Sequence, residues 1–193
     1  MKKILLHVCC APCAIYVVKR LQEENFEVTM FFYNPNIQPE AEYQRRKGEV
    51  ERLSAKLDLD LITSPYKTEE WLSKVSGLEY EPEGGKRCRV CYDLRLSDTA
   101  RYASLNGFDF FATTMTISPH KPAKVVNLVG REVTERINQE VEQGKTPGKK
   151  IEFLEADWKK HDGFKKACEM SHAEGFYRQD YCGCLYSKRN KIL

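Results

Sequence analysis

Short apolar runs alternate with amphipathic stretches from the first residues onward. Residues 2–8 (KKILLHV) and residues 26–33 (FEVTMFFY) have the length and the β-branched or aromatic content of buried strands. Between these two runs, the apolar residues of 14–21 recur at helical spacing. The pattern therefore predicts a strand that leads directly into a helix, followed by a second strand.

The same alternation continues through most of the remaining chain. Each further apolar run is separated from the next by a helical pattern or by a stretch rich in Gly and Pro. The predicted elements are a charged helix opened by Pro39 over residues 42–57, a strand at 59–64, a short helix at 68–75, a loop at 80–87, a helix at 91–107, a strand at 108–116, a long helix within 118–144, a strand at 150–156 and a final helix at 163–175.

Repeated strand and helix alternation is typical of a parallel sheet with helices on both faces. We therefore predict a doubly wound, Rossmann-like α/β fold with a mostly parallel sheet of about five strands. Ligands of such folds bind beyond the carboxyl ends of the strands, where residues 9–13 (CCAPC) and 113–121 (TTMTISPHK) fall. We expect residues 1–193 to form a single α/β domain. Within it, residues 176–193 are a C-terminal segment that contributes a Cys-x-Cys pair to a metal site at the carboxyl ends of the strands.

Composition and charge are those of a soluble globular protein. The 193 residues suit one core, and 41% of them are hydrophobic and 31% charged. The net charge of +3 is compatible with a polyanionic partner but does not require one. The N-terminal apolar run is too short for a signal peptide, and no stretch approaches the ~18 apolar residues of a membrane span. We expect a cytoplasmic protein without membrane association.

The chain contains eight cysteines, of which seven fall in three groups. Cytosolic thiols are kept reduced, so metal or redox chemistry is a better interpretation than a disulfide framework. Seven thiols exceed the four ligands of a structural zinc site, and the pairs lie too far apart for a local zinc ribbon. This excess favours a 4Fe-4S cluster with four cysteine ligands and leaves further thiolates that could hold a second metal or perform redox chemistry. The candidate metal ligands are Cys9, Cys10, Cys13, Cys88, Cys91, Cys182 and Cys184.

Local position distinguishes some of these cysteines. Cys13 is expected at the start of a helix, where the helix dipole and free N–H groups favour a thiolate. Cys9 and Cys10 can share one metal only if the backbone has already left the strand, because strand neighbours point to opposite faces. The isolated Cys168 lies within a helical pattern, and we expect it to be a small buried hydrophobic residue. The spacing does not decide which cysteine binds which metal.

Two further classes of protein are open alternatives. Cys10 and Cys13 form a Cys-x-x-Cys pair at a helix start, which is typical of a thiol-disulfide oxidoreductase. That interpretation leaves the other two cysteine groups without a role. The third class is a zinc-stabilised RNA-binding module without redox chemistry. A brown protein that dithionite bleaches would indicate an iron–sulfur cluster, whereas the two alternatives predict colourless protein without metal or with zinc.

Four ordered motifs carry a family resemblance, namely HVCCAPC at 7–13, RCRVCYDLRLSDTA at 87–100, TTMTISPHK at 113–121 and GFYRQDYCGCLYS at 175–187. Together they resemble the QueH family of epoxyqueuosine reductases. The resemblance spans nearly the whole chain, and Cys168 lies outside the family pattern. It implies a two-electron reductive deoxygenation of the epoxide of epoxyqueuosine at the wobble position of a tRNA, giving queuosine. It also implies a tRNA carrying epoxyqueuosine as partner and an electron donor that the sequence does not identify.

Because a 4Fe-4S cluster moves one electron at a time, this reaction needs two deliveries or a second redox metal. We hypothesise that an additional iron ion binds the epoxide oxygen as a Lewis acid. Asp93 and Asp180 are candidate oxygen ligands for it.

The resemblance also implies roles for side chains near the cysteines. A splayed anticodon base requires a stacking ring, phosphate donors and amide groups, and the leaving oxygen requires an acid. An ordinary polar turn and a packed C-terminal loop are the structural alternatives. The predicted substrate contacts are Ser118, Lys121, Tyr177, Arg178 and Gln179. The candidate acids are Tyr92, Asp93, His120 and Asp180, of which Asp93, His120 and Asp180 are the predicted catalytic residues.

Basic clusters are candidates for contacts with tRNA phosphates. Solvated helix faces and turns are the alternative interpretation for each cluster. The clusters are Arg45, Arg46 and Lys47, then Lys145, Lys149 and Lys150, and finally Lys188, Arg189 and Lys191.

Overall fold

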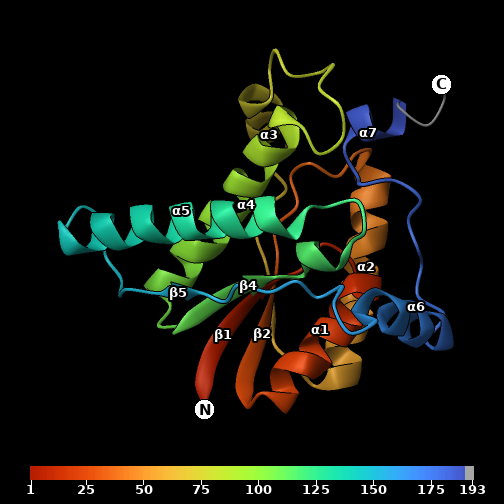
Figure 1. Cartoon of the computed structure of the whole chain (residues 1–193), viewed down its shortest axis with the longest axis horizontal. Helices are drawn as coiled ribbons and strands as arrows, with labels where there is room; N and C mark the ends of the chain where they lie inside the picture. Colours follow the sequence, from red (N-terminus) through yellow and green to blue (C-terminus); the bar gives the residue numbers. More distant parts are fainter. Residues whose placement is uncertain (190–193) are drawn as a thin grey trace.

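The computed structural model describes residues 1–189, and a five-stranded sheet lies at its centre (Figure 1). The strands are arranged in the order β3-β2-β1-β4-β5, and every neighbouring pair is parallel. This topology confirms the predicted doubly wound α/β fold. The strands are β1 (Lys2–His7), β2 (Phe26–Phe32), β3 (Leu61–Thr63), β4 (Phe110–Thr113) and β5 (Glu152–Phe153).

Helices cover both faces of this sheet (Figure 1). Because strand side chains alternate between faces, Ile4 and Leu6 pack into one apolar core and Leu5 into the other. The first core is completed by α1 (Ala11–Glu23), α2 (Glu40–Leu57) and α6 (Gly163–Ala173), and the second by α3 (Thr68–Lys74), α4 (Lys86–Leu105) and α5 (Ala123–Glu142). The short α7 (Leu185–Arg189) ends the described part of the chain.

The turn from β1 into α1 follows the sequence prediction. β1 ends at His7, and Cys10 is the extended N-cap residue of α1. Pro12 lies in the first helical turn, where its missing N–H group needs no partner. Val17 and Val18 are fully buried against the sheet, as the helical spacing predicts. The first cysteine group therefore lies at the carboxyl end of a central strand.

Cys88 and Cys91 both lie within a helix that begins earlier than the sequence predicted. Gly84 adopts a φ of +88° that completes the turn, and Gly85 is the extended N-cap residue. No helix breaker follows, so α4 begins at Lys86 instead of at Cys91. Cys88 and Cys91 are consequently one helical turn apart on the same face.

Three strands are shorter than the sequence predicted. β3 comprises only Leu61–Thr63. β4 ends at Thr113 because the Thr113 hydroxyl accepts a hydrogen bond from the Met115 N–H (3.1 Å) and starts the 3-10 helix η1 (Thr114–Ile117). β5 comprises only Glu152–Phe153 at the sheet edge. Within residues 1–189, no helix has the length and apolar character needed to cross a bilayer.

Gly130 on α5 is closely packed against β5, whereas Gly48 on α2 has open space around it, and this difference predicts opposite effects on stability when each is replaced by alanine. A β-carbon at Gly130 would overlap the Phe153 ring, whereas one at Gly48 on α2 would meet nothing within 4 Å. Gly130→Ala should lower the free energy of unfolding by about 1–3 kcal/mol through overpacking. Gly48→Ala should raise it by about 0.5–1 kcal/mol through helix propensity. Urea unfolding of both variants measures the difference, and equal effects would contradict this packing.

Candidate metal centre

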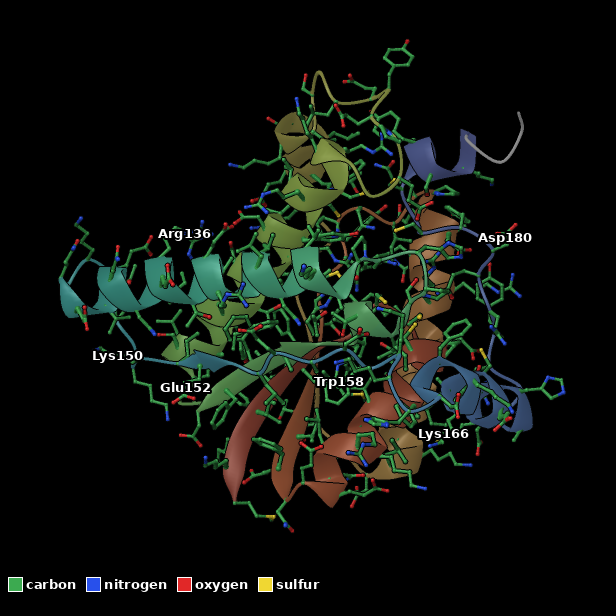
Figure 2. All side chains as sticks on the ribbon, viewed as in Figure 1. Arg136, Lys150, Glu152, Trp158, Lys166 and Asp180 are labelled. Atoms are coloured by element: carbon green, nitrogen blue, oxygen red, sulfur yellow. The ribbon has the colours of Figure 1, made fainter. Side chains whose placement is uncertain are left out.

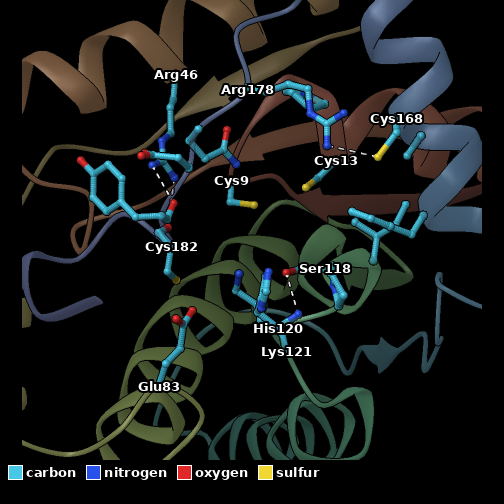
Figure 3. Close-up of a pocket in the computed structure, with 18 of the residues that line it drawn as sticks. Cys9, Cys13, Arg46, Glu83, Ser118, His120, Lys121, Cys168, Arg178 and Cys182 are labelled. Atoms are coloured by element: carbon cyan, nitrogen blue, oxygen red, sulfur yellow. Dashed lines mark hydrogen bonds between the residues drawn. The ribbon is translucent and has the colours of Figure 1, made fainter. Parts of the chain in front are cut away.

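A cavity of about 210 Å³ opens where β1 and η1 lead into the following helices (Figure 3). Four stretches far apart in the sequence supply most of its wall, namely the start of α1, the connection from η1 to α5, helix α6 and residues 178–182. Its lining residues are Cys9, Pro12, Cys13, Arg46, Glu83, Arg95, Ile117, Ser118, Pro119, His120, Lys121, Phe164, Ala167, Cys168, Arg178, Gln179, Asp180, Tyr181 and Cys182.

The first cysteine group, Cys9, Cys10 and Cys13, is compact. The three sulfur atoms lie within 4.8 Å of one another, and the Sγ atoms of Cys9 and Cys10 are 3.8 Å apart. A tetrahedral ion with metal–sulfur bonds of ~2.3 Å places its sulfur ligands about 3.8 Å apart. The backbone has left the strand after His7, so Cys9 and Cys10 no longer point to opposite faces. This group has the spacing that a single metal ion requires.

Within this group, the first negative charge resides on Cys9. Hydrogen bonds from the Cys10 and Cys13 thiols hold the pKa of Cys9 well below its ordinary value, despite burial. The hydrogen bonds that Cys13 donates to Cys10 and Cys9 raise its own pKa well above the ordinary value, and burial adds to the effect. The Thr114 hydroxyl also lies 3.7 Å from the Cys9 sulfur. The local structure therefore supports an anionic sulfur before any ligand is considered.

The other four motif cysteines form what we call the second cysteine group. It combines Cys88 and Cys91 of α4 with Cys182 and Cys184, which precede α7. Burial and the charges of Cys182 and Cys184 raise the pKa of Cys91 to about 11, although Arg95 opposes the shift. The same two cysteines act on the pKa of Cys88, which burial raises, while the Gly84 N–H donates to the Cys88 sulfur at 3.2 Å. Cys88, Cys91 and Cys184 also belong to the same buried core. Cys182 is the member that lines the cavity.

Hydrogen bonds fasten the Cys182-Gly183-Cys184 segment to the loop before α2. The Gln38 N–H donates to the Gly183 carbonyl at 2.8 Å, and the Tyr181 hydroxyl donates to the Gln38 carbonyl at 2.6 Å. Arg46 of α2 donates to the carbonyls of Cys182 (3.0 Å) and Tyr181 (3.2 Å) (Figure 3). The position of the last two cysteines is therefore set by contacts across the fold.

Two buried cations lie among the cysteine groups. Arg95 is 1% exposed and Lys121 is 8% exposed, and no carboxylate of residues 1–189 forms an ion pair with either. Burial opposes the charge of Lys121, but the negative charges of Cys182 and Cys9 outweigh it and raise the Lys121 pKa. Burial likewise opposes the charge of Arg95, and Cys91, Cys9 and Cys182 raise its pKa. Since an unpaired buried cation is strongly destabilising, anionic sulfur is the counter-charge at this site.

His7 supports this arrangement as a neutral structural residue. It is fully buried, and burial together with the Arg95 charge lowers its pKa to about 3. Its ring nitrogens contact the Thr113 hydroxyl at 2.9 Å and the Tyr33 carbonyl at 3.2 Å. Arg95 donates to His7 Nε2 at 3.3 Å and to the Asn34 side-chain oxygen at 2.7 Å. These contacts hold the Arg95 guanidinium in place beside the cysteines.

The structure brings most of the predicted site residues to the cavity. Their roles in substrate binding and proton transfer stay predictions, since position alone does not test them. The Ser118 hydroxyl accepts a hydrogen bond from the His120 backbone N–H at 3.3 Å, which shapes the turn before α5 (Figure 3). The predicted residues that line the cavity are Ser118, His120, Lys121, Arg178, Gln179 and Asp180.

Tyr177 and Asp93 do not line the cavity. The Tyr177 ring is covered by the Arg45 guanidinium at 3.5 Å, and its hydroxyl donates to Glu42 at 3.0 Å. Asp93 accepts from Arg136 of α5 at 3.1 Å, in an ion pair that is about two-fifths exposed. Figure 2 shows Arg136 on α5 and Asp180 on the opposite side of the molecule. We therefore do not include Asp93 or Tyr177 in the proposed site.

Two residues differ from the sequence interpretation. Cys168 is not buried, but partly exposed at the cavity, where its sulfur accepts a hydrogen bond from Arg178 at 3.2 Å (Figure 3). Arg46, grouped with a solvated basic cluster, is 1% exposed. A signal for Arg46 was present, because it lies between Tyr43 and Val50 at the helical spacing of buried positions. In the last basic cluster, Lys191 lies outside the described residues.

The fold and the site together define a parallel α/β protein with a compact cysteine cluster that could hold a metal ion. The chain belongs to the epoxyqueuosine reductase QueH family, whose sequence model matches residues 4–190. Members of this family are oxidoreductases of tRNA queuosine biosynthesis, and reduction of epoxyqueuosine is accordingly the activity of this chain.

Individual relatives agree over nearly the whole chain. The chain is 40% identical over 192 residues to epoxyqueuosine reductase QueH of Streptococcus pyogenes serotype M1, covering 96% of this chain and 70% of the relative. It is 36% identical over 188 residues to that of Haemophilus influenzae, covering 97% and 72%. For the Thermotoga maritima protein, identity is 32% over 190 residues, with coverage of 97% and 91%.

A solved structure shares the fold at low sequence identity. The U34-tRNA thiolase NcsA from Methanococcus maripaludis, solved with its [4Fe-4S] cluster, superimposes with a TM-score of 0.58 at 15% identity. The match covers 99% of this chain and 65% of that chain, so this chain spans less than two thirds of its length. At this identity the likeness concerns the fold alone.

The backbone at Gly183 predicts that a side chain there disturbs the second cysteine group. Gly183 has a φ of +126°, and a β-carbon would lie 3.0 Å from Ile37 and 3.2 Å from Arg46. Gly183→Ala should cost about 1–3 kcal/mol of stability and lower the iron bound per chain. Gly144→Ala is the control. Gly144 also has a positive φ, of +64°, but a β-carbon there would meet nothing within 4 Å, and the residue lies away from the site. It should cost about 1 kcal/mol without loss of iron, measured by unfolding and elemental analysis. Unchanged iron in Gly183→Ala would contradict this requirement.

Proposed function

We propose that this chain reduces the epoxide of epoxyqueuosine in tRNA with a [4Fe-4S] cluster and an additional iron ion held by the two cysteine groups. In the reaction, both C–O bonds of the epoxide break, a carbon–carbon double bond forms and the oxygen leaves as water. This change consumes two electrons and two protons. The observation that carries the proposal is that the sulfur atoms of three motif cysteines, Cys9, Cys10 and Cys13, lie within 4.8 Å of one another beside the buried cations Lys121 and Arg95.

The donor sets fit these metal groups. Cys88, Cys91, Cys182 and Cys184 supply the four thiolates that a [4Fe-4S] cluster takes. Cys9, Cys10 and Cys13 are spaced for one ion with a further position open, as in catalytic metal sites. When bound, the cluster supplies single electrons, and the additional iron supplies a Lewis acid for the epoxide oxygen.

Lys121 and Arg95 keep positive charge beside the sulfur atoms and offset the negative charge that accumulates there on reduction. Lys121 is also at the cavity wall, next to the turn that presents Ser118 and His120 to the substrate. His120 and Asp180 are exposed at the same cavity and are our candidates for proton delivery to the leaving oxygen. Arg178 contributes a further positive charge at the mouth, which suits the phosphates of an anticodon loop.

The remaining features of the proposal concern partners and organisation. A reductant of still unidentified chemistry supplies the electrons. The tRNA substrate supports a cytoplasmic location. We treat residues 1–193 as one α/β domain, because the hydrogen bonds of Arg46 and Gln38 attach the C-terminal segment to the sheet-and-helix framework.

Metal analysis tests the proposal against its alternatives. Protein reconstituted with iron and sulfide under anaerobic conditions should be brown, bleach with dithionite and contain more than the four iron atoms of one cluster. A count of only four iron atoms per chain would contradict the presence of the additional iron ion. Colourless protein with zinc would favour a zinc-stabilised RNA-binding module, and colourless metal-free protein a thiol-disulfide oxidoreductase.

Removal of the buried charge at position 121 predicts a loss of turnover. Lys121→Met should lower the rate of queuosine formation by about 100-fold, because an electrostatic contact to the reacting groups is lost. Lys124→Met is the matched control, since Lys124 is exposed in the first turn of α5, and it should react normally. Mass spectrometry of nucleosides from digested tRNA measures the product, with iron determined in the same samples. Normal turnover of Lys121→Met at full iron content would contradict the assigned role.

A further inference from the structure

Gln179 contacts the metal-site cysteines through its side chain. Its Nε2 donates a hydrogen bond to the Cys10 sulfur at 3.1 Å. Gln179 lies in the segment between α6 and the Cys182-Gly183-Cys184 sequence, far from Cys10 in the chain. The sequence predicted a substrate contact for this residue, whereas the structure gives its amide nitrogen a sulfur partner.

The orientation of this amide indicates what kind of sulfur it faces. The Gln179 Oε1 atom is buried and has no hydrogen-bond partner among residues 1–189. An unpaired buried carbonyl oxygen is unfavourable, and a neutral thiol, which is only a weak hydrogen-bond acceptor, compensates for it poorly. A hydrogen bond to a charged acceptor is stronger. Without a metal, Cys10 is the protonated partner of Cys9, so the Gln179 N–H group gains its charged acceptor once a bound metal ion replaces the Cys10 thiol proton.

Hydrogen bonds to ligating sulfur atoms tune the electronic properties of metal–thiolate centres. A donor stabilises the reduced state more than the oxidised state, because reduction adds negative charge that the sulfur partly carries. The Gly84 N–H makes a comparable bond to Cys88 at 3.2 Å, but it belongs to the main chain. The bond from Gln179 comes from a side chain and can be removed without changing the backbone.

We propose that Gln179 is a positioning residue that raises the reduction potential of the metal held by Cys9, Cys10 and Cys13 through its hydrogen bond to the Cys10 sulfur. This inference rests on the proposed function, in that Cys10 is taken as a ligand of redox-active iron. It assigns Gln179 to electron transfer and not to recognition of the tRNA.

The test compares anaerobically reconstituted holoproteins by redox titration, followed by electron paramagnetic resonance, with iron determined for each sample. Gln179→Leu keeps the approximate side-chain size and removes the donor, and its potential should become more negative. The expected change in the ratio of reduced to oxidised iron is about tenfold, which is ~59 mV for a one-electron couple. Gln179→Glu replaces the donor with an acceptor and should shift the potential further in the same direction. The control Gln139→Leu lies on the exposed side of α5 and should leave the potential unchanged.

The possible outcomes distinguish a failure of the proposed function from a failure of the role assigned to Gln179. Wild-type protein that binds no iron would contradict the proposed function and this inference with it. Wild-type protein with full iron, together with an unchanged potential in Gln179→Leu, would overturn only the role of Gln179. Loss of iron in both Gln179 variants would also overturn it, because the residue would then hold the site together and not tune it.

Discussion

The structure depends on electrostatic attraction between buried cations and anionic sulfur. Arg95 and Lys121 lie inside the protein without a carboxylate partner among the residues that the structure describes, and their charges are favoured by nearby cysteines. Such burial is strongly unfavourable unless opposite charge is nearby, so cations and cysteines stabilise each other's charged forms. A cluster or ion bound by several thiolates carries the negative charge that this environment requires. The same attraction explains why the cysteines are buried and yet suited to bind metal.

The parallel sheet makes this attraction a property of the whole fold. Cys9 and Cys10 follow β1, Lys121 follows β4 and η1, and Cys88 and Arg95 belong to α4. Parallel strands place their carboxyl ends on one edge, where separate connections converge on a single crevice. The C-terminal cysteines are held there by Arg46, which binds the carbonyls of Tyr181 and Cys182, and by the hydrogen bonds of Gln38. Folding and assembly of the metal site are therefore coupled.

Much of this arrangement could be predicted from local patterns. The apolar runs predicted the strands and the parallel fold, and the CCAPC segment predicted a helix that begins beside Cys13. Properties that depend on distant contacts could not be predicted. Arg46 looked like part of a solvated cluster because its carbonyl partners are 135 and 136 residues away. Gln179 and Tyr177 are two residues apart, yet one contacts Cys10 and the other lies under Arg45, because the segment has no regular period.

The central claim is that both cysteine groups bind iron, with Lys121 and Arg95 between them. The most direct measurement is a crystal structure of the anaerobically reconstituted protein with iron located by anomalous scattering. The account predicts strong iron density bonded to Cys88, Cys91, Cys182 and Cys184, and a separate iron peak bonded to Cys9, Cys10 and Cys13. Fully reconstituted protein with iron at only one group, or with no iron bonded to these cysteines, would contradict it.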